Sequence, residues 1–248
     1  MTDFFDPRFP DSASLRAQAQ KSMPKFAFEY LEGGCIDEIG LHRNTNELQQ
    51  VRLRSELLSP SVDVDTSVDL FGHRYAAPFG IAPVGLQGLM WPNAPEILAK
   101  AAAKMNIPYV LSTVSSSSLE RIAEVSEGQA WYQLYNPTDA NTREDLLDRL
   151  KASGYQNIMV TVDVPTFGYR VNDIKNGLSM PPKMSLTNII QMLTKPSWLL
   201  ATALAGKPEM ETLKPYMPPN MPADQLASFM NNTVMGPVDF DALKVLRD

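Results

Sequence analysis

The sequence predicts an α/β protein of the (β/α)8 TIM-barrel class, of which the 248 residues supply an N-terminal helical extension and about four βα units. From residue 78 onward, a short apolar strand and a helix alternate four times, which is typical of a parallel sheet. Polar side chains follow the ends of three successive strands, as they do at the rim of a barrel. No Gly-x-Gly-x-x-Gly motif follows the first strand, which argues against an open, dinucleotide-binding sheet.

The composition limits the kind of partner. The chain has 22 basic and 28 acidic residues, a net charge of −6 and no long run of either sign, which argues against nucleic-acid binding. Its single cysteine, Cys35, excludes an internal disulfide and a cysteine metal cluster, and we expect no metal site. No secretory signal is recognisable, so we expect a reducing, cytoplasmic setting. The longest apolar run, Trp198–Ala205, is shorter than the ~20 residues of a membrane-spanning helix.

Residues 1–77 are expected to form an extension ahead of the first barrel strand. The expected elements are a helix capped by Ser12 or Ser14, a helix over Phe26–Leu31, a helix from about Asp37, and a hairpin over Val68–Tyr75 around Gly72-His73. Tyr30, at the end of the second helix, is either an aromatic core residue or a side chain that the extension places in a cleft.

Residues 78–179 carry the four strand-helix repeats. The expected strands are Phe79–Ala82, Tyr109–Thr113, Ala130–Tyr135 and Ile158–Val164, and the expected helices are Pro95–Met105, Leu119–Val125 and Arg143–Ala152. The polar residues at the ends of the last three strands are Ser112, Gln133 with Tyr135, and Thr161 with Asp163. Because the C-terminal ends of parallel barrel strands meet at one rim, we expect these side chains to share a site.

The fourth strand carries the clearest indication of function. Every second residue from Ile158 to Val164 is apolar, which predicts a buried strand. Thr161 and Asp163 point the other way, and burying an unpaired carboxylate costs free energy. We interpret Asp163 as functional, with a turn-capping aspartate as the alternative. Pro165 is expected to end the strand, so that Arg170 lies on the loop at the rim.

Residues 180–238 are expected to form a long loop, with 239–248 as the start of a further helix. The loop contains eight methionines and nine prolines without a clear period. A run of this length is a functional lid, a surface-contact segment or disorder. Within it, Asn188–Leu204 resembles an amphipathic helix interrupted by Pro196. Its Met, Trp and Leu content suits a membrane surface or a protein partner, with packing on its own domain as the alternative.

Taken together, these residues resemble a known family. The motifs that carry the resemblance are Pro24-Lys25-Phe26, Glu29-Tyr30, Gly33-Gly34, Asp37-Glu38, Asn44, Leu53-Arg54, Ile81-Ala82-Pro83, Leu111-Ser112-Thr113, Gln133-Leu134-Tyr135, Thr161-Val162-Asp163-x-Pro165 and Gly168-x-Arg170-x-x-Asp173-x-x-Asn176. In this order they resemble the FMN-dependent 2-hydroxy acid dehydrogenase and oxidase family, which includes glycolate oxidase and the flavin-linked L-lactate and mandelate dehydrogenases. The resemblance covers the N-terminal portion of that family's sequence, from Pro24 to about Pro182.

The resemblance implies an FMN cofactor. The residues that it implies beneath the flavin are Ala82, Pro83, Val84 and Gly85, and those that it implies at the edge of the ring system are Ser112, Gln133 and Thr161. Val84 replaces the family's usual threonine, in a contact made mostly by the backbone.

The resemblance also implies roles in binding the substrate and in catalysis. Tyr135 would contact the hydroxyl side of the substrate, and Tyr30 and Arg170 would bind its carboxylate. Asp163 would orient a catalytic histidine and stabilise its charge, since a neighbouring carboxylate raises the basicity of an imidazole.

Other family residues have no counterpart in this sequence. The lysine near the flavin, the base histidine of a Ser-Asn-His-Gly-like motif, a further arginine and the flavin-phosphate site belong to later strands. His42 and His73 lie outside the expected strand ends, so neither is assigned the base role. We therefore expect the N-terminal part of an enzyme that oxidises a small lactate-, glycolate- or mandelate-like L-2-hydroxy acid, inactive as it stands.

Two alternatives remain open at this point. One is a shortened, catalytically inactive flavin-binding or interaction module. The other is a different flavin barrel, similar to type 2 isopentenyl diphosphate isomerase, which Tyr30, Tyr135 and Arg170 disfavour. The expected electron acceptor is a quinone, a cytochrome or oxygen, and a complete barrel is expected to form a homo-oligomer. The expected location is cytoplasmic, or peripheral on the inner face of the membrane through residues 185–235.

Overall fold

The computed structural model describes residues 6–58, 63–164, 168–178, 183–222 and 225–247. At its centre, three parallel strands pair in the order β3 (Val110–Ser112), β4 (Trp131–Leu134) and β5 (Ile158–Val160). The predicted first strand is reduced to a parallel bridge between Ile81 and Tyr109. Consecutive strands of a barrel pair in this way, in parallel and in chain order.

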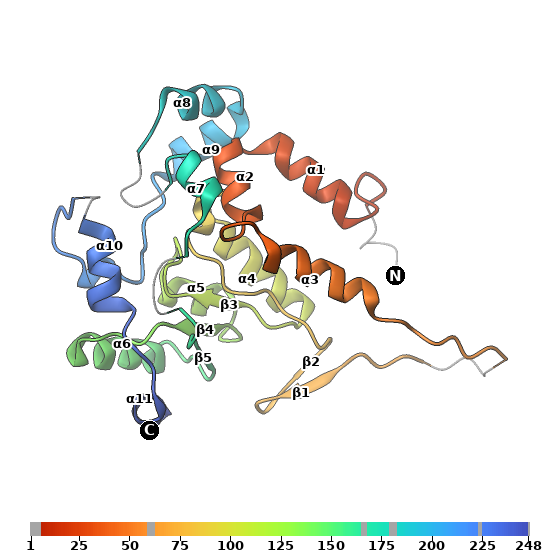
Figure 1. Ribbon diagram of the computed structural model, residues 1–248. Coiled ribbons are helices and arrows are strands. Elements are labelled where there is room, and N and C mark those ends of the chain that lie inside the picture. Colours follow the sequence, from red (N-terminus) through yellow and green to blue (C-terminus); the bar gives the residue numbers. More distant parts are fainter. Residues whose placement is uncertain (1–5, 59–62, 165–167, 179–182, 223–224, 248) are drawn as a thin grey trace.

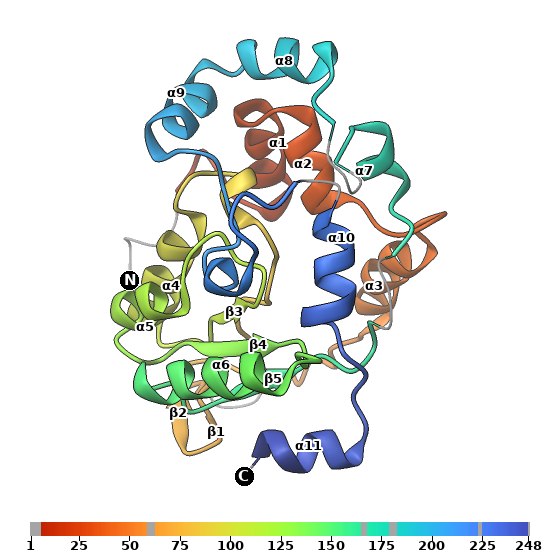
Figure 2. The same ribbon diagram turned by 90° about the vertical axis from the view of Figure 1, so that its left-hand side faces the viewer.

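Three helices follow the strands and pack beside one another (Figure 2). They are α4 (Ala94–Met105), α5 (Leu119–Val125) and α6 (Ala140–Ala152). The predictions for α4 and α5 are confirmed, whereas α6 begins earlier than predicted. Asp139 caps α6, since its carboxylate accepts a hydrogen bond from the Thr142 N–H at 2.8 Å. The main core is formed by buried residues of the strands and these helices, among them Tyr109, Leu111, Leu119, Ile122, Tyr132, Leu134, Leu146 and Leu150.

The burial predicted for the fourth strand is wrong. Ile158 and Met159 of β5 are exposed, and Val162 beyond it is 66% exposed. Within the described residues, β5 pairs with β4 alone and forms an edge of the sheet, so no further strand shields its outer side. Pro165, predicted to end the strand, lies outside the described residues.

The predicted N-terminal helices are present as α1 (Ser12–Ser22), α2 (Lys25–Glu32) and α3 (Ile39–Gln50). The predicted cap of α1 is wrong. Asp11 takes that place, because its carboxylate accepts hydrogen bonds from both the N–H and the hydroxyl of Ser14, at 2.8 and 2.6 Å.

The predicted hairpin is confirmed as β1 (Val68–Leu70) and β2 (His73–Tyr75), which pair antiparallel. Its turn lies one residue earlier than predicted. Phe71 and Gly72 have φ angles of 49° and 84°, the positive values that a tight hairpin turn requires. In Figure 1 the hairpin projects from the body of the molecule.

Residues 180–238, expected as a long loop, contain several helices, and the further helix expected from residue 239 is present as α11 (Phe240–Arg247). The chain beyond the sheet is therefore helical over much of its described length. The elements are α7 (Val171–Lys175), α8 (Leu186–Leu193), α9 (Pro196–Ala205), the short helix η2 (Lys214–Tyr216), α10 (Leu226–Phe229), the π-helical turn η4 (Met230–Val234) and α11 (Phe240–Arg247). The break between α8 and α9 falls at Pro196, as predicted. Figure 1 shows α7, α8 and α9 at the same end of the molecule as α1 and α2. No helix in the described parts of the chain is long and apolar enough to cross a membrane.

Candidate active site

Side chains link the C-terminal ends of the three strands. Ser112 and Gln133 are paired residues of β3 and β4, and Ser112 Oγ donates to Gln133 Oε1 at 3.2 Å. Gln133 Nε2 in turn donates to Thr161 Oγ1 at 2.8 Å, just beyond β5. The structure therefore joins Ser112, Gln133 and Thr161, three of the five polar residues that the sequence predicted at one rim.

The amide of Gln133 is held in one orientation. Its Oε1 also accepts a hydrogen bond from the Thr113 backbone N–H at 3.2 Å, and the Thr113 hydroxyl donates to the Gln133 carbonyl at 2.5 Å. Gln133 is 3% exposed, so these bonds replace water around a buried amide. The acceptor oxygen therefore points to β3 and the donor nitrogen to β5.

A cleft of about 450 Å³ opens at these strand ends. It is lined by Tyr30, Pro83, Gly85, Leu86, Ser112, Val114, Gln133, Tyr135, Thr161, Val164, Gly168, Arg170, Met210, Met230 and Met235. The size and the mixture of apolar walls with a few convergent polar groups are typical of a small-molecule site.

Tyr30 and Arg170 form one wall of this cleft. The Tyr30 hydroxyl donates to the Gly85 carbonyl at 3.3 Å, and the Arg170 guanidinium lies 5.3 Å from the centre of the Tyr30 ring. Arg170 Nη2 donates to the Tyr30 carbonyl, and its Nε donates to the buried Asp173 carboxylate at 2.6 Å. Of the two interpretations of Tyr30, the cleft residue is the one supported, because its hydroxyl reaches the glycine that lines the site.

The two tyrosines of the cleft are held in their protonated form. Burial raises the pKa of Tyr30, partly offset by the positive charge of Arg170. Burial also raises the pKa of Tyr135, and the negative charge of Asp163 adds to that shift. Both phenols are therefore hydrogen-bond donors at neutral pH.

Three of the predicted site residues do not line the cleft. Ala82 is exposed, and Val84 packs against the cluster that contains Phe26 and Trp198. Asp163 is exposed beyond β5, and its influence on the cleft is its charge near Tyr135.

The methionines of the cleft were not predicted as site residues. Met210, Met230 and Met235 come from the region that the sequence assigned to a long loop. The density of methionine in that region was the available signal. Methionine fills cores as readily as binding surfaces, so the signal alone could not locate a site.

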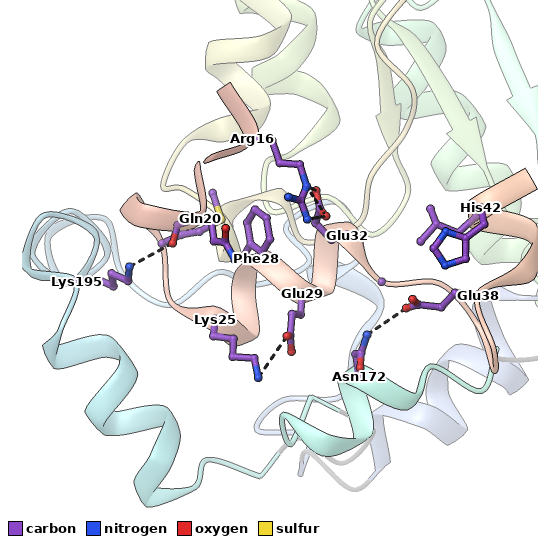
Figure 3. A pocket seen from close by; sticks show the side chains of 13 residues that line it. Arg16, Gln20, Lys25, Phe28, Glu29, Glu32, Glu38, His42, Asn172 and Lys195 are labelled. Atoms are coloured by element: carbon purple, nitrogen blue, oxygen red, sulfur yellow. Dashed lines mark hydrogen bonds and ion pairs between the residues drawn. The ribbon is translucent and has the colours of Figure 1, made fainter. Parts of the chain in front are cut away.

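A second hollow, of about 520 Å³, lies among the N-terminal helices (Figure 3). Its charged side chains already have partners. Arg16 pairs with Glu32 and Lys25 with Glu29, whereas Glu38 accepts from Asn172 and Lys195 donates to the Gln20 carbonyl. His42 also lines it, away from the strand ends. Since these charges already have partners, the cleft at the strand ends is the candidate site.

Comparisons with known proteins identify the family of the chain. The family model described as FMN-dependent dehydrogenase matches residues 19–248. The L-lactate dehydrogenase of Vibrio parahaemolyticus is 38% identical over 197 residues, which cover 79% of this chain and 52% of that protein. The L-lactate dehydrogenase of Ectopseudomonas mendocina is 37% identical over the same shares. The chain thus spans about half the length of the curated relatives that it matches.

Solved structures resemble the chain over almost its whole length. A monotopic membrane protein, (S)-mandelate dehydrogenase, superposes with a TM-score of 0.86 at 30% identity, covering 95% of this chain and 62% of that one. A mandelate oxidase superposes with a TM-score of 0.71 at 30% identity, covering 95% of this chain and 58% of that one.

Proposed function

Because the chain belongs to the FMN-dependent dehydrogenase family, we propose that it supplies the flavin-binding strand ends and part of the substrate site of an enzyme that oxidises a small L-2-hydroxy acid to the 2-oxo acid. The predicted barrel class is confirmed by the same comparisons, with βα units in barrel order. One observation carries the proposal: the hydrogen-bonded series Ser112, Gln133, Thr161 lines the same cleft as Tyr30, Tyr135 and Arg170.

The residues of the cleft fit FMN, the cofactor of the family. Thr161 Oγ1 accepts from Gln133, so its own hydrogen remains to donate toward the polar edge of a flavin. A Cβ added at Gly85 would lie 2.7 Å from Val114 Cγ2, so only glycine lets this backbone pack against Val114 in the cleft, where it would lie beneath the flavin. Ala82, Pro83 and Val84 continue that backbone. FMN supplies the chemistry of accepting electrons from the α-carbon.

Arg170 and Tyr30 are proposed to bind the carboxylate of the substrate. Two of the guanidinium nitrogens of Arg170 are engaged, by Asp173 and by the Tyr30 carbonyl, and this fixes the plane of the group. Within the described residues, Nη1 has no such partner and is the nitrogen that would meet the carboxylate.

Tyr135 and Asp163 are proposed to act at the reacting carbon. Tyr135, protonated at neutral pH, would donate a hydrogen bond on the hydroxyl side of the substrate. Asp163 would orient a catalytic histidine and stabilise its positive charge. His42 lines the second hollow, and His73, in β2, hydrogen-bonds the Asn106 side chain. Neither histidine is therefore assigned the role of the catalytic base.

A hybrid enzyme would test the proposal. In it, this chain is followed by the part of the Vibrio parahaemolyticus relative that lies beyond the match. Purified with FMN, it should lose visible flavin absorbance under anaerobic conditions when L-lactate, mandelate or another L-2-hydroxy acid is added. A hybrid that binds FMN and is reduced by dithionite, but by none of these acids, would favour a flavin-binding module instead.

We also propose that α8 and α9 rest on a lipid surface. The polar side of α8 faces the protein, because the buried Asn188 donates to the Asn176 carbonyl at 2.8 Å and Gln191 accepts from the Phe26 N–H at 3.1 Å. Leu186 and Leu193 face outward, 74% and 64% exposed. This polarity is the reverse of that of an ordinary surface helix.

Such a surface suits the interfacial helix of a peripheral membrane protein. Among the expected electron acceptors, contact with lipid favours a quinone or a membrane cytochrome. The double variant Leu186→Gln/Leu193→Gln should weaken co-sedimentation with phospholipid vesicles at least tenfold, since burying one leucine contributes about 1.5–3 kcal/mol. The matched control is Leu48→Gln on α3, a leucine with the same exposure. If the control variant loses vesicle binding to the same extent, the proposed contact of α8 with lipid is wrong.

A further inference from the structure

We infer that Met210, Met230 and Met235 form the wall that receives the substituent on the α-carbon, so that the preferred substrate is a 2-hydroxy acid with an apolar group larger than the methyl group of lactate. This inference rests on the proposed function. Glycolate, which has no such group, should be the poorest ligand.

The three methionines belong to one apolar cluster beside Tyr135. Met210 and Met230 are buried, and Met235 and the Tyr135 ring pack against them. All four residues also line the cleft. An acid whose hydroxyl side met Tyr135 would therefore have thioether side chains next to its α-carbon.

The apolar and the polar parts of the lining come from different segments. Tyr30 belongs to α2 and Arg170 precedes α7, whereas the methionines come from the segment between α9 and α11. Leu86 and Val114 extend the apolar part, and both also contact the methionine cluster. An amphiphilic acid, with a carboxylate at one end and a hydrocarbon group at the other, matches this division of the lining.

The backbone behind the methionines is held to the βα units at two places. Arg149 of α6 donates to the Thr212 carbonyl and to the Tyr216 hydroxyl, both at 3.0 Å. Asn136, which follows β4, accepts from the Gly236 N–H at 2.7 Å and donates to the Pro237 carbonyl at 2.8 Å.

A fixed backbone with flexible side chains predicts a tolerant pocket. Methionine has three rotatable bonds and a polarizable sulfur, so it adapts to both unbranched and aromatic groups. Met230 begins the π-helical turn η4, a rare conformation that is frequent at functional sites. Each methylene buried against this wall should tighten binding about fourfold.

The test measures binding by the 248-residue chain itself. The chain is labelled with 13C in the methionine methyl groups and kept in saturating FMN, since it should hold the cofactor only weakly. Met159→Lys on the edge strand β5 limits self-association. The chain is titrated with glycolate, L-lactate, L-2-hydroxybutyrate, L-2-hydroxyhexanoate and L-mandelate. We expect the signals of Met210, Met230 and Met235 to shift, and the affinity to rise about fourfold for each methylene along the aliphatic series until the pocket is full.

Two variants distinguish contact between the methionines and the substituent from a general loss of protein stability. Met235→Gln keeps the length of the side chain and should cut the advantage of hydroxyhexanoate over glycolate at least fivefold, while the affinity for glycolate stays within twofold. Met184→Gln, at an exposed methionine that does not line the cleft, should leave the whole series unchanged. As a second measurement, kcat/KM of the hybrid enzyme should rise along the same series of acids.

The outcomes distinguish this inference from the function on which it rests. One contrary result is that all the acids bind with equal affinity, and another is that Met235→Gln weakens the binding of glycolate as much as that of hydroxyhexanoate. Either result would refute the inferred role of the methionines and leave the proposed function standing. If no acid shifts any methionine signal of the cleft, either in the chain itself or in the hybrid enzyme, the inference and the proposed function are both overturned.

Discussion

Gln133 Nε2 lies 2.8 Å from Thr161 Oγ1, so the ends of β4 and β5 are joined by side chains as well as by backbone hydrogen bonds. The bond also decides which way the hydroxyl of Thr161 can donate. Since its oxygen accepts from Gln133, its hydrogen must serve another acceptor. A flavin edge is the acceptor that the proposed function supplies.

Replacing Thr161 by valine should weaken FMN binding about threefold to tenfold in the hybrid enzyme. The change keeps the shape of the side chain and removes one hydrogen bond, which is worth about 0.5–1.5 kcal/mol. Quenching of flavin fluorescence on titration measures the Kd. Thr187→Val, at an exposed threonine of α8, is the control, and identical affinities for the two variants would contradict the assignment.

Replacing Arg170 by methionine should raise the KM or Kd for a 2-hydroxy acid about a hundredfold and leave the flavin spectrum nearly unchanged. A charged hydrogen bond contributes about 1.5–3 kcal/mol, and the guanidinium stands over Tyr30 rather than at the strand ends. Steady-state kinetics and flavin absorbance of the hybrid enzyme measure both effects. Arg170→Lys should recover part of the affinity through charge alone. If the variant loses bound flavin in parallel with its affinity for the substrate, Arg170 does not act as the carboxylate-binding residue.

Replacing Asp163 by asparagine should lower turnover strongly and leave thermal unfolding unchanged. The carboxylate is exposed, so its charge is dispensable for folding, whereas it would stabilise a protonated base. Parallel kinetics and melting curves of the hybrid enzyme separate these effects. A large fall in Tm with unchanged activity per folded molecule would support the turn-capping alternative.

The same variant should shift the titration of Tyr135. The negative charge of Asp163 disfavours the phenolate and raises the pKa of Tyr135, so removing that charge should lower this pKa. Ultraviolet difference titration, with Tyr135→Phe to identify the signal, measures the change. The phenol of Tyr135 should then ionise at a lower pH in the variant than in the parent, and an unaltered titration would mean that the two groups do not interact.

The 248-residue chain by itself should associate with itself, and should neither hold FMN tightly nor oxidise a 2-hydroxy acid. In the described sheet β5 presents an unpaired edge, and Ile158 and Met159, which point to opposite faces of the sheet, are both exposed. Met159→Lys should reduce association, because a charged side chain on an edge strand opposes pairing. Light scattering after gel filtration in excess FMN measures the size. A yellow monomer that bleaches anaerobically with lactate would overturn this expectation.

The sequence predicted those features that depend on neighbours along the chain. The limits of α5, the hairpin of β1 and β2, and the positions of Ser112, Gln133 and Thr161 at strand ends follow from periodicity and turn residues. What failed depends on distant contacts. The periodicity of Ile158–Val164 could not reveal that β5 has a neighbour on one side only within the described sheet.

The polarity of the later helices was also beyond local reasoning. The spacing in α8 indicated an amphipathic helix, but which side faces the protein depends on the Asn176 carbonyl beyond the helix and on the Phe26 N–H, which is distant in sequence. The methionine wall depends in the same way on the bonds of Arg149 and Asn136 to the segment that carries it.

The contacts of Arg149 have a consequence for how substrate range can change. Besides its bonds to the Thr212 carbonyl and the Tyr216 hydroxyl, Arg149 donates to the Glu120 carboxylate of α5 at 2.8 Å. The Tyr216 hydroxyl in turn donates to Asp145 of α6 at 2.5 Å. The wall of the cleft is thus braced from the outer helices. A laboratory selection for enzymes with a new substrate should therefore recover substitutions at Arg149, Tyr216 or Asp145, none of which lines the cleft.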